Sequence, residues 1–138
     1  MDIKDVERDA EDDNDLIRAV VATYQEASRT GSVELYRRAF HSSAHVCYPS
    51  NEDGSLVVQP IEEFVAEIAS LVSDGTVVEE TARSITVQVA GSVASAQVDF
   101  TLRIGNQSFA GTDFMSFARL GPGWMITHKL YAMAPIAP

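Results

Sequence analysis

The chain has 138 residues, of which 46% are hydrophobic and 22% are charged, and these values are typical of one folded globular domain. Its formal net charge of −10 argues against nucleic acid or an anionic membrane surface as a partner. The single cysteine, Cys47, excludes an internal disulfide and a zinc site built on several cysteines.

The start of the chain carries much of the negative charge. Residues 1–15 hold eight acidic residues against Lys4 and Arg8, a net charge of −6. We interpret residues 1–13 as an acidic leader or the start of a helix, and residues 14–134 as one domain. No basic segment precedes an apolar run, so we expect no signal peptide, and no apolar run is long enough to cross a bilayer. A cytoplasmic location is the expectation.

The first half of the chain has helical periodicity. "DLIRAVVATYQEASRTG" predicts a helix that is capped by one of residues 13–15 and stopped by Gly31. Its predicted apolar stripe is Leu16, Val20, Thr23, Tyr24 and Ala27. A short second helix follows over 33–40 with Ser32 as N-cap, and then a strand over 44–49, a turn at 51–54 and a return strand over 55–59. A third helix is predicted from Pro60 to the residues before Gly75.

From residue 80 the apolar residues alternate, which predicts four antiparallel strands joined by turns at 91–92, 105–106 and around 121–122. The first two turns set Val98 opposite both Ile85 and Asp113. The third sets Phe117 opposite Ile126, and Met115 opposite His128. Because opposite residues share a face, one sheet face is apolar except for Asp113 and His128, which we expect to be diagonal neighbours about 5–8 Å apart.

The order of these elements resembles the nuclear-transport-factor-2-like superfamily, over about residues 14–133. The resemblance is carried by "TYQEASRTGSVELYRRAFHSSAHVCYP" and "GTDFMSFARLGPGWMITHKL", and within the superfamily the chain is most similar to the SnoaL-like, putative lumazine-binding-like group. It implies an α+β fold shaped like a cone, in which three N-terminal helices pack on a strongly curved, mainly antiparallel sheet around one pocket. The group's name implies a ligand, and the activities of its members are mostly undefined.

One enzyme of the superfamily, ketosteroid isomerase, has a pattern that this chain follows in part. Tyr24, Gly31, Phe40, Ala44 and the Tyr48-Pro49 pair fall at its spacings, and Asp113 precedes apolar residues as its later Asp does. That likeness implies that Tyr24 and Asp113 donate hydrogen bonds to a ligand oxygen, since in that enzyme an apolar site keeps the later Asp protonated. The general base of the enzyme is the Asp before Pro, where this chain has Tyr48, and a neutral phenol is a poor base.

The buried carboxylate suggests a ligand site. An ionised Asp113 among apolar side chains must be protonated, paired or hydrated, and the purely structural alternative is a pair with His128, Arg83 or Arg119. We predict Asp113 and His128 as catalytic candidates if the protein is an enzyme, with His128 as acid or base. The predicted ligand-binding residues are Tyr24, Tyr48, Phe100, Asp113, Met115, Phe117, Trp124 and His128.

Three functions remain open. The first is a binding protein with an apolar pocket for a hydrophobic, oxygen-bearing small molecule. The second is a cofactor-independent isomerase, dehydratase or cyclase acting on a cyclic ketone-like substrate, and the third is a structural dimeric module with a vestigial cavity. No phosphate loop, nucleophile elbow or metal-ligand spacing is present in the sequence, so we infer no cofactor and no metal. The other sheet face carries Phe114, Met125 and Tyr131, and we expect a homodimer through it.

Overall fold

The computed structural model describes residues 3–137, with side chains from residue 12 onward. Its elements in chain order are α1 (Ile3–Thr30), α2 (Val33–Ala39), β1 (Phe40–Pro49), β2 (Leu56–Pro60), α3 (Ile61–Ser73), β3 (Val78–Ala90), β4 (Val93–Ile104), β5 (Gln107–Leu120) and β6 (Gly123–Pro135). The strands form one sheet in the order β2-β1-β6-β5-β4-β3. Only the β1–β6 pair within this sheet is parallel.

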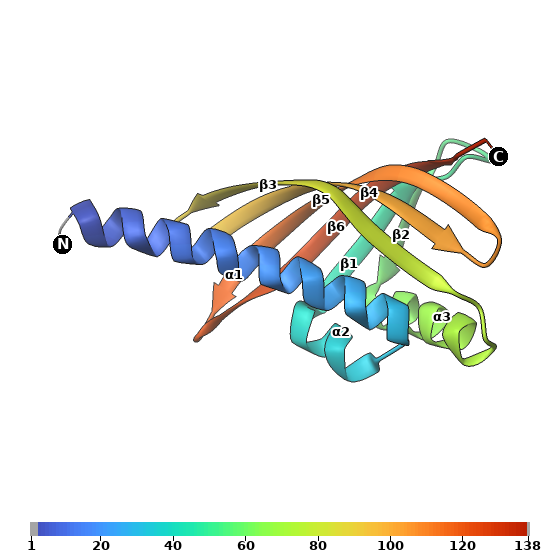
Figure 1. Ribbon diagram of the computed structural model, residues 1–138, viewed down its shortest axis with the longest axis horizontal. Coiled ribbons are helices and arrows are strands. Elements are labelled where there is room, and N and C mark those ends of the chain that lie inside the picture. The colour runs from blue at the N-terminus through green and yellow to red at the C-terminus, as the bar shows by residue number, and fades with distance from the viewer. Residues whose placement is uncertain (1–2, 138) are drawn as a thin grey trace.

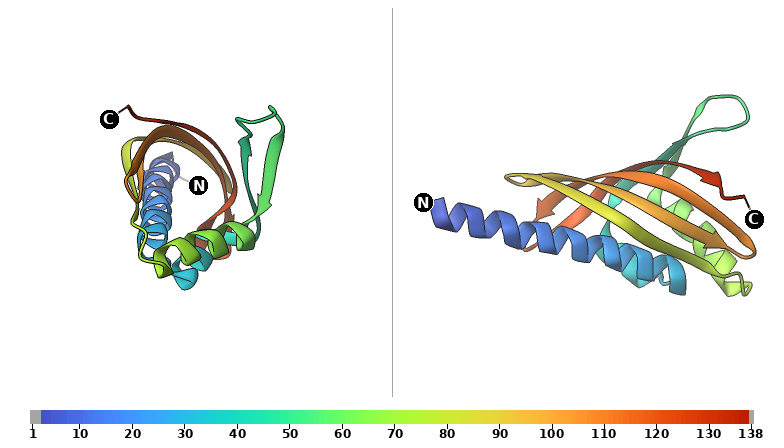
Figure 2. Two further views of the ribbon diagram at one scale, coloured as in Figure 1. Left: turned by 90° about the vertical axis from the view of Figure 1, so that its right-hand side faces the viewer. Right: turned by 45° about the horizontal axis from the view of Figure 1, so that its top comes forward.

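The sheet curves around α1, and α2 and α3 lie beside the second half of that helix (Figures 1 and 2). Viewed along the helix, the strands form an open cone with α1 inside it (Figure 2, left). The predicted α+β cone fold is therefore confirmed. In the part of the chain that the structure describes, no helix combines the length and apolar composition needed to span a membrane.

Helix α1 begins earlier than the sequence pattern predicted. It starts at Ile3, so residues 13–15 lie inside the helix and do not cap it. Its buried stripe is Ile17, Val21, Tyr24 and Ala27, whereas Leu16 is 50% exposed. The predicted stripe was one residue out of phase in its first half, because the sheet covers the side of the helix that faces Ile17.

The next elements follow the prediction closely. The side chain of Ser32 accepts a hydrogen bond from the backbone N–H of Leu35 and so caps α2. Gly31 has a φ of +68°, as the turn between α1 and α2 requires. Strand β1 begins at Phe40 and not at Ala44, because Phe40 already pairs with Ile126 of β6.

The first two hairpins have the predicted registers. Ile85 pairs with Val98, and Val98 pairs with Asp113. Gly91 and Gly105 have φ values of +61° and +59°, which the two-residue turns require. The alternation that starts from these turns therefore places Asp113 on the inner face of the sheet.

The third hairpin has the predicted register only near its turn. Phe117 pairs with Ile126, but Ser116 then pairs with His128, so Thr127 is an extra residue in a β-bulge. Beyond it Met115 faces Lys129, and the predicted Met115–His128 pair is wrong. Because the bulge reverses the phase of the strand, His128 and Leu130 lie on the outer face of the sheet.

Candidate functional site

Asp113 and Lys129 form a buried charged pair inside the cone. They lie on the adjacent strands β5 and β6, where Lys129 is opposite Met115. Both side chains are almost completely excluded from solvent, and Nζ of Lys129 is 3.5 Å from Oδ1 of Asp113. Neither oxygen of Asp113 accepts a hydrogen bond from any residue that the structure describes. The ammonium group therefore compensates the carboxylate charge but leaves its hydrogen-bonding capacity unused.

Tyr24 on α1 and Glu80 on β3 extend this pair into a larger polar group. The hydroxyl of Tyr24 is in hydrogen-bond contact with Nζ of Lys129. It also donates to Oε1 of Glu80 at 3.3 Å, and the Gln25 amide donates to Oε2 at 3.4 Å. We call Tyr24, Glu80, Asp113 and Lys129 the buried polar cluster, and each of its members comes from a different element.

Three aromatic rings surround the ammonium group of Lys129. Its Nζ lies 4.6 Å from the ring centroid of Tyr24, 5.2 Å from that of Phe64 and 4.6 Å from that of Tyr131. These distances are within the range of cation–π attraction. Helix α3 thereby contributes Phe64 to the site, and Tyr131 lies on the inner face of the sheet, contrary to its predicted outer position.

Burial changes the acidity of the cluster. It raises the pKa of the Asp113 carboxyl, an effect that the charge of Lys129 opposes. It raises the pKa of Glu80 to about 7, with Lys129 again opposing. Burial also raises the pKa of Tyr24 well above its ordinary value of 10.0, so this phenol keeps its proton. Glu80 can therefore exchange a proton near neutral pH, while Tyr24 remains a hydrogen-bonding group.

A cavity of about 80 Å³ adjoins the cluster. Its lining residues are Tyr24, Ser28, Phe64, Ile68, Val78, Glu80, Phe100, Leu102, Ile104, Lys129, Tyr131 and Met133. Most of these side chains are apolar, and the polar ones are Lys129, Glu80, Tyr24, Tyr131 and Ser28. Because a single water needs on the order of 10–15 Å³ of such space, the cavity accepts a functional group with a few carbon atoms.

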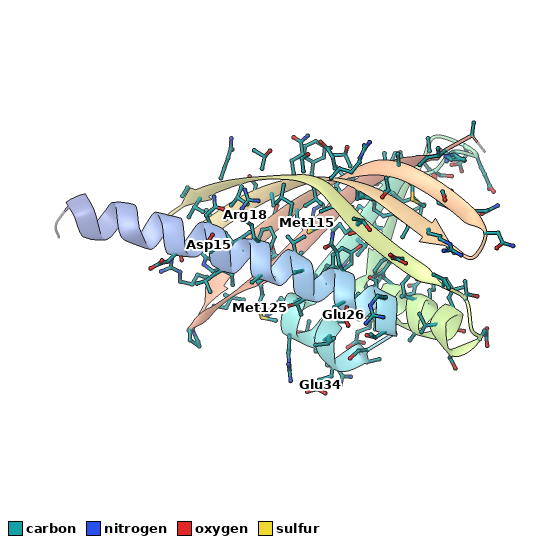
Figure 3. All side chains as sticks on the ribbon, viewed as in Figure 1. Asp15, Arg18, Glu26, Glu34, Met115 and Met125 are labelled. Carbon is teal, nitrogen blue, oxygen red and sulfur yellow. The ribbon has the colours of Figure 1, made fainter. Side chains whose placement is uncertain are left out.

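A larger hollow of about 620 Å³ lies elsewhere, between α2, α3 and the start of β1. It is lined by Tyr36, Phe40, Ile61 and Val65 among others, and by Met125, which lies beside the helices in Figure 3. None of the buried polar cluster reaches it. We therefore place the candidate site at the smaller cavity, where the titratable groups converge.

The structure separates the predicted ligand-binding residues into four sets, one of which is His128 alone on the outer face. Tyr24 and Phe100 line the cavity, and Asp113 contacts Lys129 in its wall. Tyr48 does not line the cavity, but its ring centroid lies 5.2 Å from that of Tyr131, which does. The remaining apolar residues, Met115, Phe117 and Trp124, are buried in the core away from the cavity lining, and Met115 lies between the sheet and α1 in Figure 3.

Trp124 belongs to a separate contact near the first part of α1. Its indole N–H donates to Oδ1 of Asp13 at 3.0 Å. The guanidinium group of Arg119 pairs with the other oxygen of Asp13 and lies 5.0 Å from the centroid of the Trp124 ring. The aspartate expected near the helix start therefore fixes α1 to the β5–β6 hairpin, and the suggested Arg119–Asp113 pair does not form.

His128 does not reach the cluster. Its Nε2 lies 3.4 Å from Sγ of Cys47, and His128 pairs with His45 across the β1–β6 boundary on the outer face. The predicted His128–Asp113 proximity is wrong because of the bulge at Thr127. His128 and Asp113 therefore lie on opposite faces of the sheet.

Lys129 and Glu80 are the residues of the cluster that the sequence pattern missed. A buried Asp113 needs a compensating charge, and Lys129 is the only lysine or arginine in β6. The sequence therefore held enough information to suggest Lys129 as the partner of Asp113. Glu80 was hidden by a second bulge, because the β3–β4 register shifts between Ala82 and Ser84. Strict alternation counted back from Ile85 would have placed Glu80 on the outer face.

The outer face carries an apolar row across four strands. Val58 pairs with Cys47, Cys47 with Leu130, and Leu130 with Phe114. Val58, Leu130 and Phe114 are exposed. We call these four residues the outer apolar row. Of the three residues predicted for this face, Phe114 belongs to the row.

Comparison with known proteins extends these observations. Residues 12–132 match the model of a family described as putative lumazine-binding. No curated protein matches the chain at a significant level. Among solved structures, an NTF2-like protein of unknown function from Shewanella baltica OS155 has a TM-score of 0.71 at 23% sequence identity, covering 89% of this chain and 94% of that chain.

Two further structures have the same fold. A conserved protein from Planctomyces limnophilus has a TM-score of 0.79 at 18% identity, covering 91% of this chain and 99% of its own. A protein described as a putative ketosteroid isomerase from Shewanella frigidimarina has a TM-score of 0.64 at 15% identity, covering 85% and 94%. The family match spans nearly the whole chain, and the chain therefore belongs to the putative lumazine-binding family.

Proposed function

We propose that the protein binds a small, hydrophobic, carbonyl-bearing molecule in the cavity beside the buried polar cluster. The observation that carries the proposal is the cavity itself, whose mainly apolar wall ends at Lys129, Tyr24 and Glu80. The ammonium group is a donor for a carbonyl oxygen, the phenol becomes a second donor if it releases its hydrogen bond to Glu80, and the aromatic and aliphatic walls favour an apolar body. The family name is consistent with a ligand of this kind.

The volume limits how such a ligand binds. Typical ligand pockets measure roughly 300–1,000 Å³, and this cavity measures about 80 Å³. The carbonyl end of the ligand would enter, and the rest would lie against Leu102, Ile104 and Met133 at its edge or displace them. Small cyclic ketones are therefore preferred over intact steroids.

Differential scanning fluorimetry against cyclic ketones, lumazines, flavins, steroids and polyketides tests binding. Leu102→Trp fills the cavity, and we expect it to abolish the stabilisation that the best compound gives. Leu56→Trp is the matched control, because Leu56 is exposed on β2 and does not line the cavity. No stabilisation of the wild type by any compound, or equal stabilisation of the Leu102→Trp variant, would contradict the proposal.

One observation favours an enzyme as the second candidate. Glu80 has a pKa of about 7 and contacts Tyr24, so a general base poised for neutral pH stands beside two oxyanion donors. In this version Glu80 would take a proton next to the carbonyl group, and Tyr24 and Lys129 would stabilise the enolate. Turnover of an enone panel by the wild type and by Glu80→Gln tests it. Equal rates, at the uncatalysed background, would exclude an isomerase of this kind.

A further inference from the structure

In the buried Asp113–Lys129 pair, the carboxylate is poorly stabilised in its charged form. Asp113 is completely buried, and neither of its oxygens accepts a hydrogen bond from a described residue. The cation that the structure places beside it is Nζ of Lys129, at 3.5 Å. An ion pair in an apolar interior requires such hydrogen bonds to offset the loss of hydration. Transfer of one proton from the ammonium group to the carboxylate gives a neutral amine and a neutral acid, which avoids that cost.

The lysine of this pair also borders the cavity. Lys129 lines the cavity together with Tyr24 from α1, Glu80 from β3 and Tyr131 from β6. Tyr24 contacts Nζ and holds the end of a side chain that is otherwise flexible. A buried amine with a proton acceptor at one side and a cavity at the other has the arrangement of a nucleophilic lysine.

We propose that Lys129 forms an imine with the carbonyl carbon of the bound molecule, and that Asp113 moves the protons for this step. The inference rests on the proposed function, and it specifies the ligand as an aldehyde or an unhindered ketone. Tyr24 contacts this nitrogen and is itself hydrogen-bonded to Glu80, so the two residues together hold Lys129 at the cavity.

The step balances without any external reagent. Asp113 accepts a proton from the ammonium group, and the free amine forms a bond from its nitrogen to the carbonyl carbon. Asp113 then gives this proton to the former carbonyl oxygen and takes one from the nitrogen, which leaves a carbinolamine. When Asp113 protonates the hydroxyl group, the C–O bond breaks and water leaves. The products are a protonated imine on Lys129, an ionised Asp113 as its counter-ion, and one water.

The chain offers a sharp test because it contains only two lysines, Lys4 and Lys129. The full chain is incubated with cyclopentanone or benzaldehyde and sodium cyanoborohydride, which reduces an imine to a stable amine. Peptide mapping by mass spectrometry then compares the adduct on Lys129 with that on Lys4 and on the terminal amine within the same sample. We expect at least about a tenfold excess at Lys129, because the bound carbonyl is held next to its nitrogen.

Two variants and one control complete the design. Lys4→Arg should leave the adduct yield unchanged, and Lys129→Met should remove the adduct. Asp113→Asn retains the amine but lacks the proton acceptor, so adduct formation should slow by about a hundredfold. Since these core variants could unfold, the ratio between Lys129 and Lys4 in the wild type is the decisive measurement.

Thermal stabilisation by the same probes, measured without the reductant, separates the two proposals. Stabilisation together with an adduct on Lys129 supports both. Stabilisation without an adduct, or with equal labelling of both lysines, overturns the imine and leaves the binding proposal intact. If the wild type shows neither stabilisation nor an adduct with these probes, the imine is overturned, and the wider compound panel decides the binding proposal.

Discussion

Asp113 and Lys129 are diagonal neighbours on β5 and β6, and their charged atoms approach to 3.5 Å in the interior of the protein. Lys129→Met should lower the free energy of unfolding by about 3–5 kcal/mol, because it leaves a buried carboxylate without a compensating charge. The double variant Asp113→Leu/Lys129→Met should recover most of that loss, since two apolar groups need no hydration. Urea unfolding of the wild type and the variants measures both effects.

The single variant Asp113→Leu measures what the buried carboxylate contributes to stability. If the carboxylate brought only a desolvation cost, the apolar replacement would raise the free energy of unfolding. With Lys129 left unpaired we expect it to fall by about 3–5 kcal/mol. A double variant as unstable as either single variant would mean that cavity or packing effects outweigh the charges at this position.

Glu80 makes stability depend on pH. Its pKa in the folded protein is about 7, above the ordinary value of 4.5, so the folded state favours the protonated form. The contribution of Glu80 is therefore fully present below pH 4.5 and is lost as the pH rises to 7. One pKa unit corresponds to about 1.4 kcal/mol, so the loss is on the order of 3 kcal/mol.

Urea unfolding at pH 5, 6, 7 and 8 checks this expectation against Glu80→Gln, which cannot ionise. The difference in stability between the wild type and the variant should move in favour of the variant as the pH rises, and should level off above about pH 8. A difference that does not change with pH would show that the Glu80 carboxyl titrates normally in the folded state.

Asp13 fixes the first part of α1 to the sheet through Trp124 and Arg119. Asp13→Ala should lower the free energy of unfolding by about 1–3 kcal/mol, because the indole N–H is left buried without an acceptor. Asp13→Asn retains an oxygen for that N–H and should lose less. Circular dichroism during thermal unfolding measures the difference. Equal losses in the two variants would attribute the stabilisation to the Arg119 charge and not to the indole hydrogen bond.

Gly111 is required by crowding and not by its backbone conformation. A Cβ at this position would lie 2.4 Å from the backbone oxygen of Ala132 and 2.7 Å from both Met133 and Phe100. Gly111→Ala should therefore cost about 1–3 kcal/mol through overpacking. Gly123→Ala is the matched control on the neighbouring strand, since no described atom lies near its position. Similar melting temperatures for the two variants would contradict the crowding.

We propose that the outer apolar row is the contact between two copies of the chain. Leu130 lies in the row and is 39% exposed, whereas Leu120 lies at the end of β5, outside the row, and is 43% exposed. Leu130→Arg should convert a dimer into a species of 15.0 kDa, and Leu120→Arg should not. Light scattering coupled to size exclusion gives the mass. A wild type that is already monomeric at micromolar concentration would refute the proposed interface.

The sequence predicted the fold well where short turns determine the register. The turns at 91–92 and 105–106 leave little choice of pairing, so the inner position of Asp113 followed from counting alone. The position of His128 could not be obtained in this way. A bulge adds one residue to one strand, and here neither Thr127 nor its neighbours differ in type from ordinary strand residues. The bulge therefore exchanged the faces of His128 and Lys129. The group beside Asp113 is the ammonium group of Lys129 and not the expected imidazole of His128.

The candidate site was only half predictable for a related reason. Tyr24 was found from the family spacing, and Asp113 from the conflict between its charge and its apolar neighbours. Glu80 lies beyond the bulge in β3, where the phase of the strand changes again. Two of the polar residues at the cavity, Glu80 and Lys129, thus come from stretches beyond bulges, where side-chain alternation no longer indicates which residues face inward.

Trp124 is the only tryptophan of the chain, and it contacts α1 eleven residues before Tyr24. Along a helix this separation amounts to about 16 Å. The protein therefore carries a single indole fluorophore, which is remote from the cavity but contacts α1, the helix that also contributes Tyr24 to the cavity. A ligand that only fills the cavity should leave the indole emission unchanged, whereas one that displaces Tyr24 and shifts α1 should alter it. Fluorescence can thus report whether ligand binding in the cavity changes the contact between Trp124 and α1.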